Sequence, residues 1–174
     1  YHASLLPWAE RHLAHGAPRG ENGSPRLRVL ALLPPPAARP ESSLVHMAGV
    51  LLDRWDDGGG GFLAGPDWEL QVDAVEAAFA RAVEEDAPVL LLATAFALVH
   101  WMEGREGEGR PPLRLPPGSR IMETGGFKGR SRELPRAPFL EWVSRSTGVP
   151  PHAIVNEYGM TEMLSQFYEP VLGE

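Results

Sequence analysis

One short run near the end of the chain carries side chains that could bind and activate a nucleotide. It spans residues 156–162 and has the sequence NEYGMTE. Tyr158 can present the face of its ring to a base, because the neighbouring Gly159 has no side chain to obstruct the approach. The Thr161 hydroxyl can donate a hydrogen bond to a phosphate oxygen, and the Glu162 carboxylate is the hard oxygen ligand that Mg²⁺ prefers. In this order, these residue types predict a nucleotide site.

A second segment, residues 125–131 (GGFKGRS), is rich in glycine and precedes the NEYGMTE run by one predicted helix. Gly125 and Gly126 let the backbone approach a flat or anionic ligand closely, and Lys128 and Arg130 can neutralise phosphate or carboxylate charge. The same composition is also typical of a glycine-rich connection whose two cations face water. Its place beside the NEYGMTE run favours the ligand-binding interpretation.

Both segments follow short apolar runs that predict β-strands. Residues 119–123 precede the first segment, residues 153–156 lead into the second, and a helical segment lies between them. In an open parallel sheet the carboxyl ends of the strands lie along one edge, where ligands bind. We therefore expect the turns that hold Gly125 and Tyr158 to lie side by side at that edge and to share one purine.

The rest of the chain alternates strand and helix patterns, which predicts βαβ units. We expect residues 1–174 to form a single α/β domain, with a mostly parallel sheet and helices on both faces. Ser42 or Ser43 is the expected N-cap of the second helix. The predicted elements are helices over 2–15, 44–55, 72–85 and 94–102, strands over 26–33, 62–64 and 88–93, and a surface connection over 104–117.

The composition argues against several classes of protein. With 174 residues, 43% of them hydrophobic, the chain can bury a substantial core. Its net charge of -7 argues against a nucleic-acid partner, which needs clustered lysine and arginine. The absence of cysteine excludes a disulfide framework, a thiolate metal site and a cysteine nucleophile, and it fits a cytoplasmic location. No run approaches the roughly 18 apolar residues of a membrane span.

Other motifs predict structure rather than chemistry. Residues 58–61 are four glycines, but they lack the Lys-Ser or Lys-Thr pair of a phosphate loop and favour a flexible turn. His12 and His15 lie one helical turn apart without a paired carboxylate, so we expect a surface pair rather than a metal site. The charged face of helix 72–85, which includes Glu76, is expected to be solvated. No G-x-S-x-G motif is present, which argues against a serine hydrolase.

The sequence YGMTE at 158–162 resembles the conserved motif of the adenylate-forming superfamily, which includes acyl-CoA synthetases, firefly luciferase and nonribosomal-peptide adenylation domains. Residues 123–133 (ETGGFKGRSRE), the NEYGMTE run and residues 165–168 (SQFY) together resemble the LuxE-type acyl-protein synthetases more closely than other branches. Residues 42–44 and 93–98 also resemble that branch. The resemblance therefore covers most of the chain.

The resemblance implies a two-step reaction that uses ATP and Mg²⁺. A carboxylic acid, which is a fatty acid in this branch, attacks the α-phosphorus of ATP to give an acyl-adenylate and pyrophosphate. A thiol then takes the acyl group. The implied partners are the acid and a thiol acceptor, either a protein cysteine or coenzyme A, and a complex with an acyl reductase is left open.

The resemblance also implies roles for particular residues. Thr161 would bond the α-phosphate, Glu162 would hold Mg²⁺ directly or through water, and Tyr158 would stack on adenine. Phe96 and Met160 would border the acyl pocket. The nucleotide-binding positions implied in this way are Gly125, Gly126, Tyr158, Gly159, Met160 and Thr161.

The chain begins at Tyr1 without a methionine and ends at Glu174, soon after the NEYGMTE run. We therefore expect a central fragment of the N-terminal domain of an adenylate-forming enzyme, inactive by itself. The superfamily's phosphate loop would precede this chain, and its ribose-binding aspartate and catalytic lysine would follow. The acyl-carrying cysteine of the luminous-bacterial enzymes is absent from the sequence. The alternatives are an acyl- or aryl-CoA ligase of the same superfamily, or a non-catalytic scaffold homologue.

Overall fold

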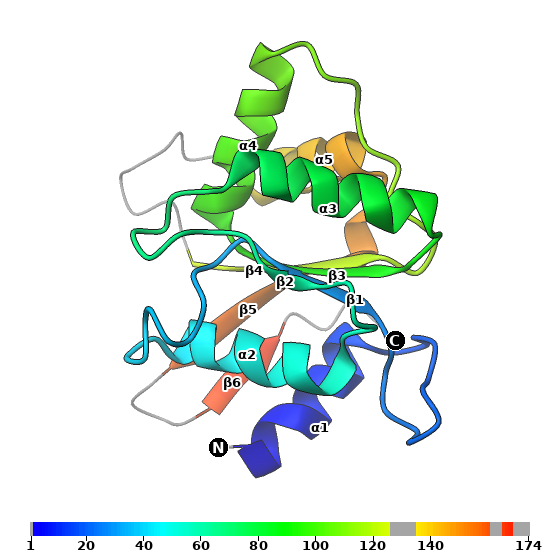
Figure 1. The fold of residues 1–174 in the computed structure, drawn as a ribbon, viewed down its shortest axis with the longest axis vertical. Coiled ribbons are helices and arrows are strands. Elements are labelled where there is room, and N and C mark those ends of the chain that lie inside the picture. The colour runs from blue at the N-terminus through cyan, green and yellow to red at the C-terminus, as the bar shows by residue number, and fades with distance from the viewer. Residues whose placement is uncertain (1, 126–134, 161–164, 169–174) are drawn as a thin grey trace.

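The computed structural model describes residues 2–125, 135–160 and 165–168, in which helices and strands alternate along most of the chain (Figure 1). The helices are α1 (His2–Leu13), α2 (Ser43–Trp55), α3 (Val72–Glu84), α4 (Ala95–Gly107) and α5 (Arg136–Thr147), with a short 3-10 turn, η1, at Pro151–Ala153. The strands are β1 (Arg28–Ala31), β2 (Gly61–Phe62), β3 (Val89–Thr94), β4 (Arg120–Thr124), β5 (Ile154–Met160) and β6 (Ser165–Tyr168).

The strands form one sheet in the order β2-β1-β3-β4-β5-β6. The first five are parallel to one another, and β6 runs antiparallel to β5. Parallel neighbours need crossover connections, which α2 to α5 supply. The predicted fold class, α/β with a mostly parallel sheet and helices on both faces, is confirmed.

Helices cover both faces of this sheet, as Figure 1 shows, with α3, α4 and α5 in one layer and α1 and α2 in the other. Alternate strand residues point to opposite faces. Leu91 and Ile121 therefore pack with α3, α4 and α5, whereas Leu90 and Met122 pack with α1 and α2. Burial on both faces explains why the β3 sequence is continuously apolar instead of alternating.

Two helices begin where a hydroxyl side chain satisfies a free backbone N–H. Ser42 Oγ accepts a hydrogen bond from Val45 N at 3.3 Å and caps α2, as predicted. Thr94, the last residue of β3, caps α4 by accepting from Ala97 N at 3.1 Å. The chain therefore turns from β3 directly into α4, which fixes the first turn of that helix at the carboxyl edge of the sheet.

The structure corrects two predicted boundaries. Residues 157–160, predicted as part of a loop, continue strand β5, because their backbone groups pair with those of β6. Helix α4 continues to Gly107, beyond the predicted end at residue 102, because Arg105 is buried and bonds both Glu76 of α3 and the carbonyl oxygen of Pro111.

Two predictions about surface residues are also wrong. His12 is only 8% exposed and stacks on Trp8 with ring centroids 5.4 Å apart, so it is not part of a surface pair. Burial, reinforced by the neighbouring charge of Arg11, lowers the pKa of His12. Glu76 is not simply solvated either, because its carboxylate accepts a hydrogen bond from Trp101 Nε1 at 2.9 Å and pairs with Arg105.

Candidate functional site

The candidate site lies where β4 and β5 end. These strands are parallel neighbours, and their register pairs Glu123 with Asn156 and Thr124 with Glu157. Gly125 follows the last residue of β4, and Tyr158 follows Glu157 within β5, so the register places their backbones side by side at this edge of the sheet. The sequence analysis predicted this juxtaposition but placed Tyr158 in a turn, whereas the structure places it within β5, opposite Phe167 of β6.

Gly125 has the backbone geometry that a close approach requires. Its φ is +81°, in the left-handed region that residues other than glycine, asparagine and aspartate rarely adopt. In the part of the chain that the structure describes, no atom lies within 4 Å of a Cβ added at this position. A flat ligand could therefore contact the peptide at Gly125 directly.

Most of the other predicted site residues lie outside the described parts of the chain. Gly126, Thr161 and Glu162 belong to this group, as do Lys128 and Arg130. Gly159 and Met160 are placed by their backbones in β5. Gly125 and Tyr158 are therefore the predicted pair whose relative position the register establishes.

Phe96, the predicted acyl-pocket residue, lies at the same edge of the sheet. It is in the first turn of α4, two residues after Thr94, and Thr94 pairs with Thr124 across β3 and β4. Its side chain is 43% exposed, and its ring stacks on that of His100 with a centroid distance of 6.1 Å and an interplanar angle of 1°. Phe96 is thus an exposed aromatic residue one strand away from Gly125.

The strand order also defines a topological switch point. From β1 the chain crosses to β2 on one side, and from β3 it crosses to β4 on the other, so the reversal falls between β1 and β3. Crevices of this kind bind ligands in open α/β sheets. Phe96 follows β3, one of the two strands that border this switch point, and β3 is also the neighbour of β4.

Sequence reasoning missed a polar cluster on Glu123. The Glu123 side chain is 2% exposed, and its Oε1 accepts hydrogen bonds from Arg136 Nη1 at 2.6 Å and from Asn156 Nδ2 at 2.8 Å. Its position next to the glycine-rich segment could have drawn attention to it. The bond to Arg136, however, depends on how α5 packs, which strand periodicity does not reveal.

A second buried carboxyl group, Glu157, lies on the opposite face of the sheet. Burial raises the pKa of Glu157, a hydrogen bond with the Thr124 side chain lowers it, and the nearby charge of Glu123 raises it, with an upward shift as the net result. The carboxyl ends of β4 and β5 therefore carry one glutamate on each face of the sheet.

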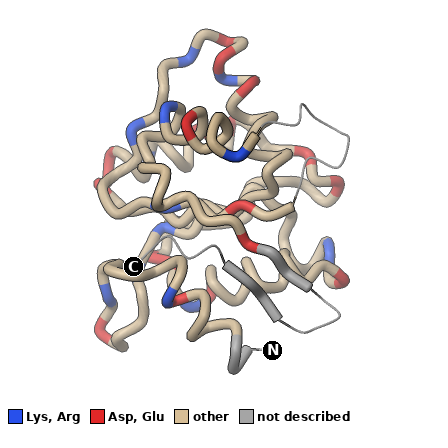
Figure 2. The backbone as a smooth tube through the Cα atoms, turned by 180° about the vertical axis from the view of Figure 1, so that it is seen from behind, with Lys and Arg blue, Asp and Glu red and all other residues tan. Residues whose placement is uncertain are grey.

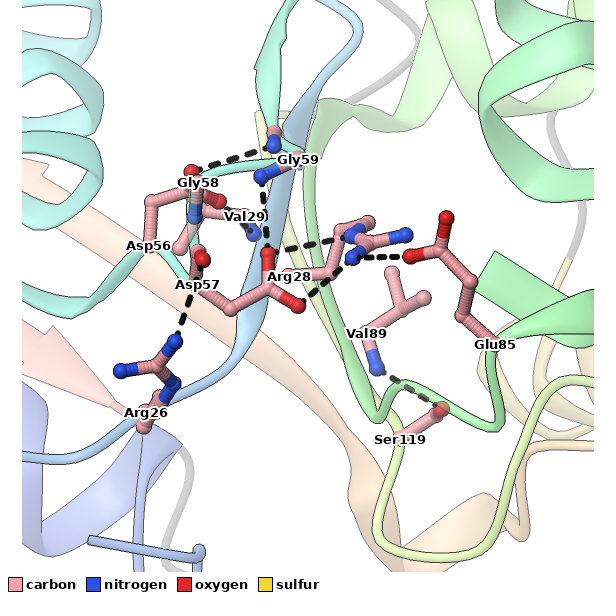
Figure 3. A network of polar contacts seen from close by, with 11 residues as sticks. Arg26, Arg28, Val29, Asp56, Asp57, Gly58, Gly59, Glu85, Val89 and Ser119 are labelled. Atoms are coloured by element: carbon pink, nitrogen blue, oxygen red, sulfur yellow. Dashed lines mark hydrogen bonds and ion pairs between the residues drawn. The ribbon is translucent and has the colours of Figure 1, made fainter. Parts of the chain in front are cut away.

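The four glycines at 58–61 belong to the other edge of the sheet, where the parallel strands begin (Figure 3). Arg28 Nη2 lies 2.8 Å from Asp57 Oδ2 and 2.7 Å from Glu85 Oε2, and Asp57 Oδ1 accepts from Gly59 N at 2.9 Å. A Cβ on Gly59 would lie 2.5 Å from the Arg28 guanidinium. Gly59 thus makes room for the Arg28 guanidinium of this ion-pair network.

Charges in the described residues are spread over both layers of the molecule, with acidic and basic positions interspersed (Figure 2). No group of three or more histidine, aspartate or glutamate side chains in the described segments is arranged to hold a metal ion. Among the same residues, no helix is both long and apolar enough to cross a membrane. No family model, curated protein or solved structure matches the chain.

Proposed function

We propose that this chain is part of an enzyme that activates a carboxylic acid, a fatty acid in the first instance, as an acyl-adenylate and transfers the acyl group to a protein thiol. The observation that supports the proposal is the adjacency of Gly125, which follows the end of β4, and Tyr158, which lies in the neighbouring parallel strand β5. These two residues belong to the two segments whose sequences resemble the adenylate-forming enzymes. Their adjacency is what a shared purine site requires.

Gly125 and Phe96, which the structure describes, would suit such a site together with the roles proposed for Tyr158 and Thr161. The open space above Gly125 would admit the edge of a purine, and Tyr158 would supply a stacking surface for the ring. Thr161 would donate to the α-phosphate oxygen on which negative charge develops, and donors aimed at such charge lower the barrier. Phe96 would contribute apolar surface to the acyl group.

Glu162 would be the protein ligand of Mg²⁺. Mg²⁺ typically uses one or two carboxylates together with substrate phosphates and water, so one glutamate beside bound ATP is a suitable protein ligand. When bound, the ion would neutralise charge on the phosphate oxygens and so favour attack by the carboxylate. The residues of this chain would orient the base and the α-phosphate.

The decisive experiment is acid-dependent exchange of labelled pyrophosphate into ATP by the full-length protein, with fatty and aromatic acids tested separately. We expect exchange with at least one fatty acid, and we expect its loss in Glu162→Gln. Asp73→Asn, which removes an exposed carboxylate from α3, is the control and should retain exchange. Absence of exchange with every acid would contradict the proposal and favour a non-catalytic scaffold.

A glycine pair tests where the base binds. Gly125→Asn keeps a residue that tolerates positive φ but fills the open space, so we expect ATP affinity to fall by about tenfold or more with little loss of stability. Gly23 also has a positive φ, +76°, and no neighbour within 4 Å of an added Cβ, and it precedes the opposite edge of the sheet. Gly23→Asn should leave ATP affinity unchanged. Equal effects of the two substitutions would exclude Gly125 from the site.

The acceptor is tested in a second assay. Purified acyl-adenylate is supplied with either coenzyme A or a cysteine-containing protein from the same cell extract, and transfer of labelled acyl groups is followed. We expect transfer to protein, stable to denaturation and released by hydroxylamine. Exclusive formation of acyl-coenzyme A would reassign the chain to the acyl-CoA ligases.

A further inference from the structure

Glu123 joins three segments of the chain through one oxygen atom. It is the penultimate residue of β4, and its Oε1 accepts from Arg136, the first residue of α5, and from Asn156 in β5. Glu123 and Asn156 also face each other in the strand register. A single buried carboxylate thus ties the end of β4 to the next strand and to the following helix.

The burial of Glu123 makes these bonds necessary. A carboxylate that is 2% exposed has lost its water, and only strong hydrogen bonds or an opposite charge compensate for that loss. The Arg136 guanidinium supplies the charge at 2.6 Å, and it is held from its other side by the Phe139 ring, 5.9 Å from the ring centroid. The Asn156 amide supplies a neutral donor.

The place of these three residues links the cluster to the candidate site. Glu123 is two residues before Gly125, and Asn156 is two residues before Tyr158. Arg136 begins the helix that follows the glycine-rich segment. We propose that Glu123 is a positioning residue that fixes the carboxyl ends of β4 and β5 and the start of α5 in one arrangement. Its catalytic consequence, which rests on the proposed function, is that Glu123 sets the separation between Gly125 and Tyr158.

The simpler alternative is an ion pair that stabilises the fold without acting on the site. The Glu76 cluster is the matched control for this alternative. Glu76 is also largely buried, with 18% of its side chain exposed, and it accepts from the neutral donor Trp101 and from Arg105. Arg110 Nη1 lies 3.3 Å from its Oε2 as a second, more exposed cation. It joins α3 to α4 instead of joining strand ends. Glu123→Gln and Glu76→Gln therefore remove the same charge in two different places.

Hydrogen exchange of the full-length protein tests the positioning role without reference to activity. In Glu123→Gln we expect faster amide exchange at residues 123–125 and 156–158, with little change at residues 89–92 in the neighbouring strand. In Glu76→Gln we expect unchanged exchange at both strand ends. Uniform acceleration across the sheet in Glu123→Gln, or no change, would overturn the proposal.

Steady-state kinetics of pyrophosphate exchange test the catalytic consequence. At a temperature where all variants are folded, Glu123→Gln and Arg136→Met should raise the KM for ATP by about tenfold, the scale of one lost charge-assisted hydrogen bond. Arg136→Lys should recover part of the loss, and Glu76→Gln should stay within about twofold of the parent protein. Equal KM values in Glu123→Gln and the parent would overturn the consequence. If the parent protein shows no pyrophosphate exchange into ATP, the proposed function fails. Amide hydrogen exchange alone then decides the positioning role.

Discussion

Thr124 and Glu157 face each other across the parallel strands β4 and β5, and the Thr124 side chain lowers the pKa of the buried Glu157 carboxyl group, against the larger upward effect of burial. This pair lies on the face of the sheet covered by α1 and α2, whereas Glu123 and Asn156 lie on the face covered by α5. The residues that lead into Gly125 and Tyr158 are therefore held by polar contacts on both faces.

The raised pKa of Glu157 predicts a pH dependence of stability. Burial, together with the charge of Glu123, outweighs the hydrogen bond of Thr124 and favours the protonated form in the folded state. The folded protein thus binds more protons than the unfolded chain between the ordinary value of 4.5 and the raised value. The stability that Glu157 contributes is fully present below pH 4.5 and is lost as the pH rises through its folded-state pKa.

Glu157→Gln removes this dependence, since an amide does not ionise. We expect the free energy of unfolding of Glu157→Gln to exceed that of the parent by an amount that grows with pH across that window and then stays constant. Urea unfolding between pH 4 and pH 8 measures this difference in the free energy of unfolding. Glu141→Gln, which removes an exposed carboxylate from α5, corrects for the change in net charge. A parent protein that gains stability relative to Glu157→Gln on raising the pH would contradict the assigned direction.

A second prediction concerns the four glycines at 58–61. A Cβ at Gly60 would overlap with the Asp56 carboxylate and the carbonyl oxygen of Val29, whereas one at Gly61 would meet nothing within 4 Å. We expect Gly60→Ala to lower the free energy of unfolding by about 2 kcal/mol, and Gly61→Ala to change it by less than about 0.5 kcal/mol. Thermal unfolding of the two variants provides the comparison. Similar destabilisation by both would mean that the glycines serve backbone flexibility, as the sequence analysis expected.

The sequence predicted the order and type of most elements because their patterns are local. A continuous apolar run indicated β3, a shorter one indicated β4, helical spacing indicated α2 and α3, and Ser42 indicated a helix start. The site was predicted through one topological rule, that parallel strands end at a common edge. The register of β4 and β5 then places Gly125 next to Tyr158.

What the sequence did not predict depends on contacts between distant residues. The extension of β5 through residues 157–160 arises from pairing with β6, and the small, polar residues there favour a loop when considered alone. Burial of His12 depends on the packing of α1 against the sheet. The Glu123 cluster needs Arg136 from α5 and Asn156 from β5 at one oxygen, and no local pattern encodes that meeting.

A third prediction concerns Arg120, which begins β4 and is buried. Its Nη1 donates to the carbonyl oxygens of Leu13 and His15, both at 3.1 Å, and so satisfies the carboxyl end of α1. Burial lowers the pKa of Arg120, yet the guanidinium remains charged. Arg120→Met leaves these carbonyl groups without their donor, and we expect a loss of about 2 kcal/mol in the free energy of unfolding.

Arg114→Met is the control for Arg120. Arg114 also donates to two carbonyl oxygens, those of Leu113 at 3.0 Å and Arg145 at 3.3 Å, but it is exposed. Water can replace its hydrogen bonds, so we expect a change of less than about 0.5 kcal/mol. Chemical denaturation of both variants measures the two changes in the free energy of unfolding. An Arg120→Met variant as stable as Arg114→Met would show that water reaches the end of α1.

The last prediction separates a structural from a functional role for Phe96. Its side chain is 43% exposed, whereas Phe79 of α3 is fully buried and packs on Trp101 with ring centroids 5.0 Å apart. Phe79→Ala should therefore cost about 4 kcal/mol in stability, while Phe96→Ala should cost less than about 1 kcal/mol. The exposed ring lies at an edge of the sheet where a ligand would meet it, so its substitution should affect the acid substrate.

In the full-length protein we expect Phe96→Ala to raise the KM for a fatty acid by about tenfold, because one aromatic side chain of apolar contact is lost, and to leave the KM for ATP unchanged. Phe96→Leu, which keeps most of the apolar surface, should recover much of this loss. The comparison of KM values for acid and ATP distinguishes an acyl-pocket residue from one that only shapes the nucleotide site. A rise in the KM for ATP with an unaltered KM for the acid would move Phe96 to the nucleotide side of the edge, and no change in either would remove it from the site.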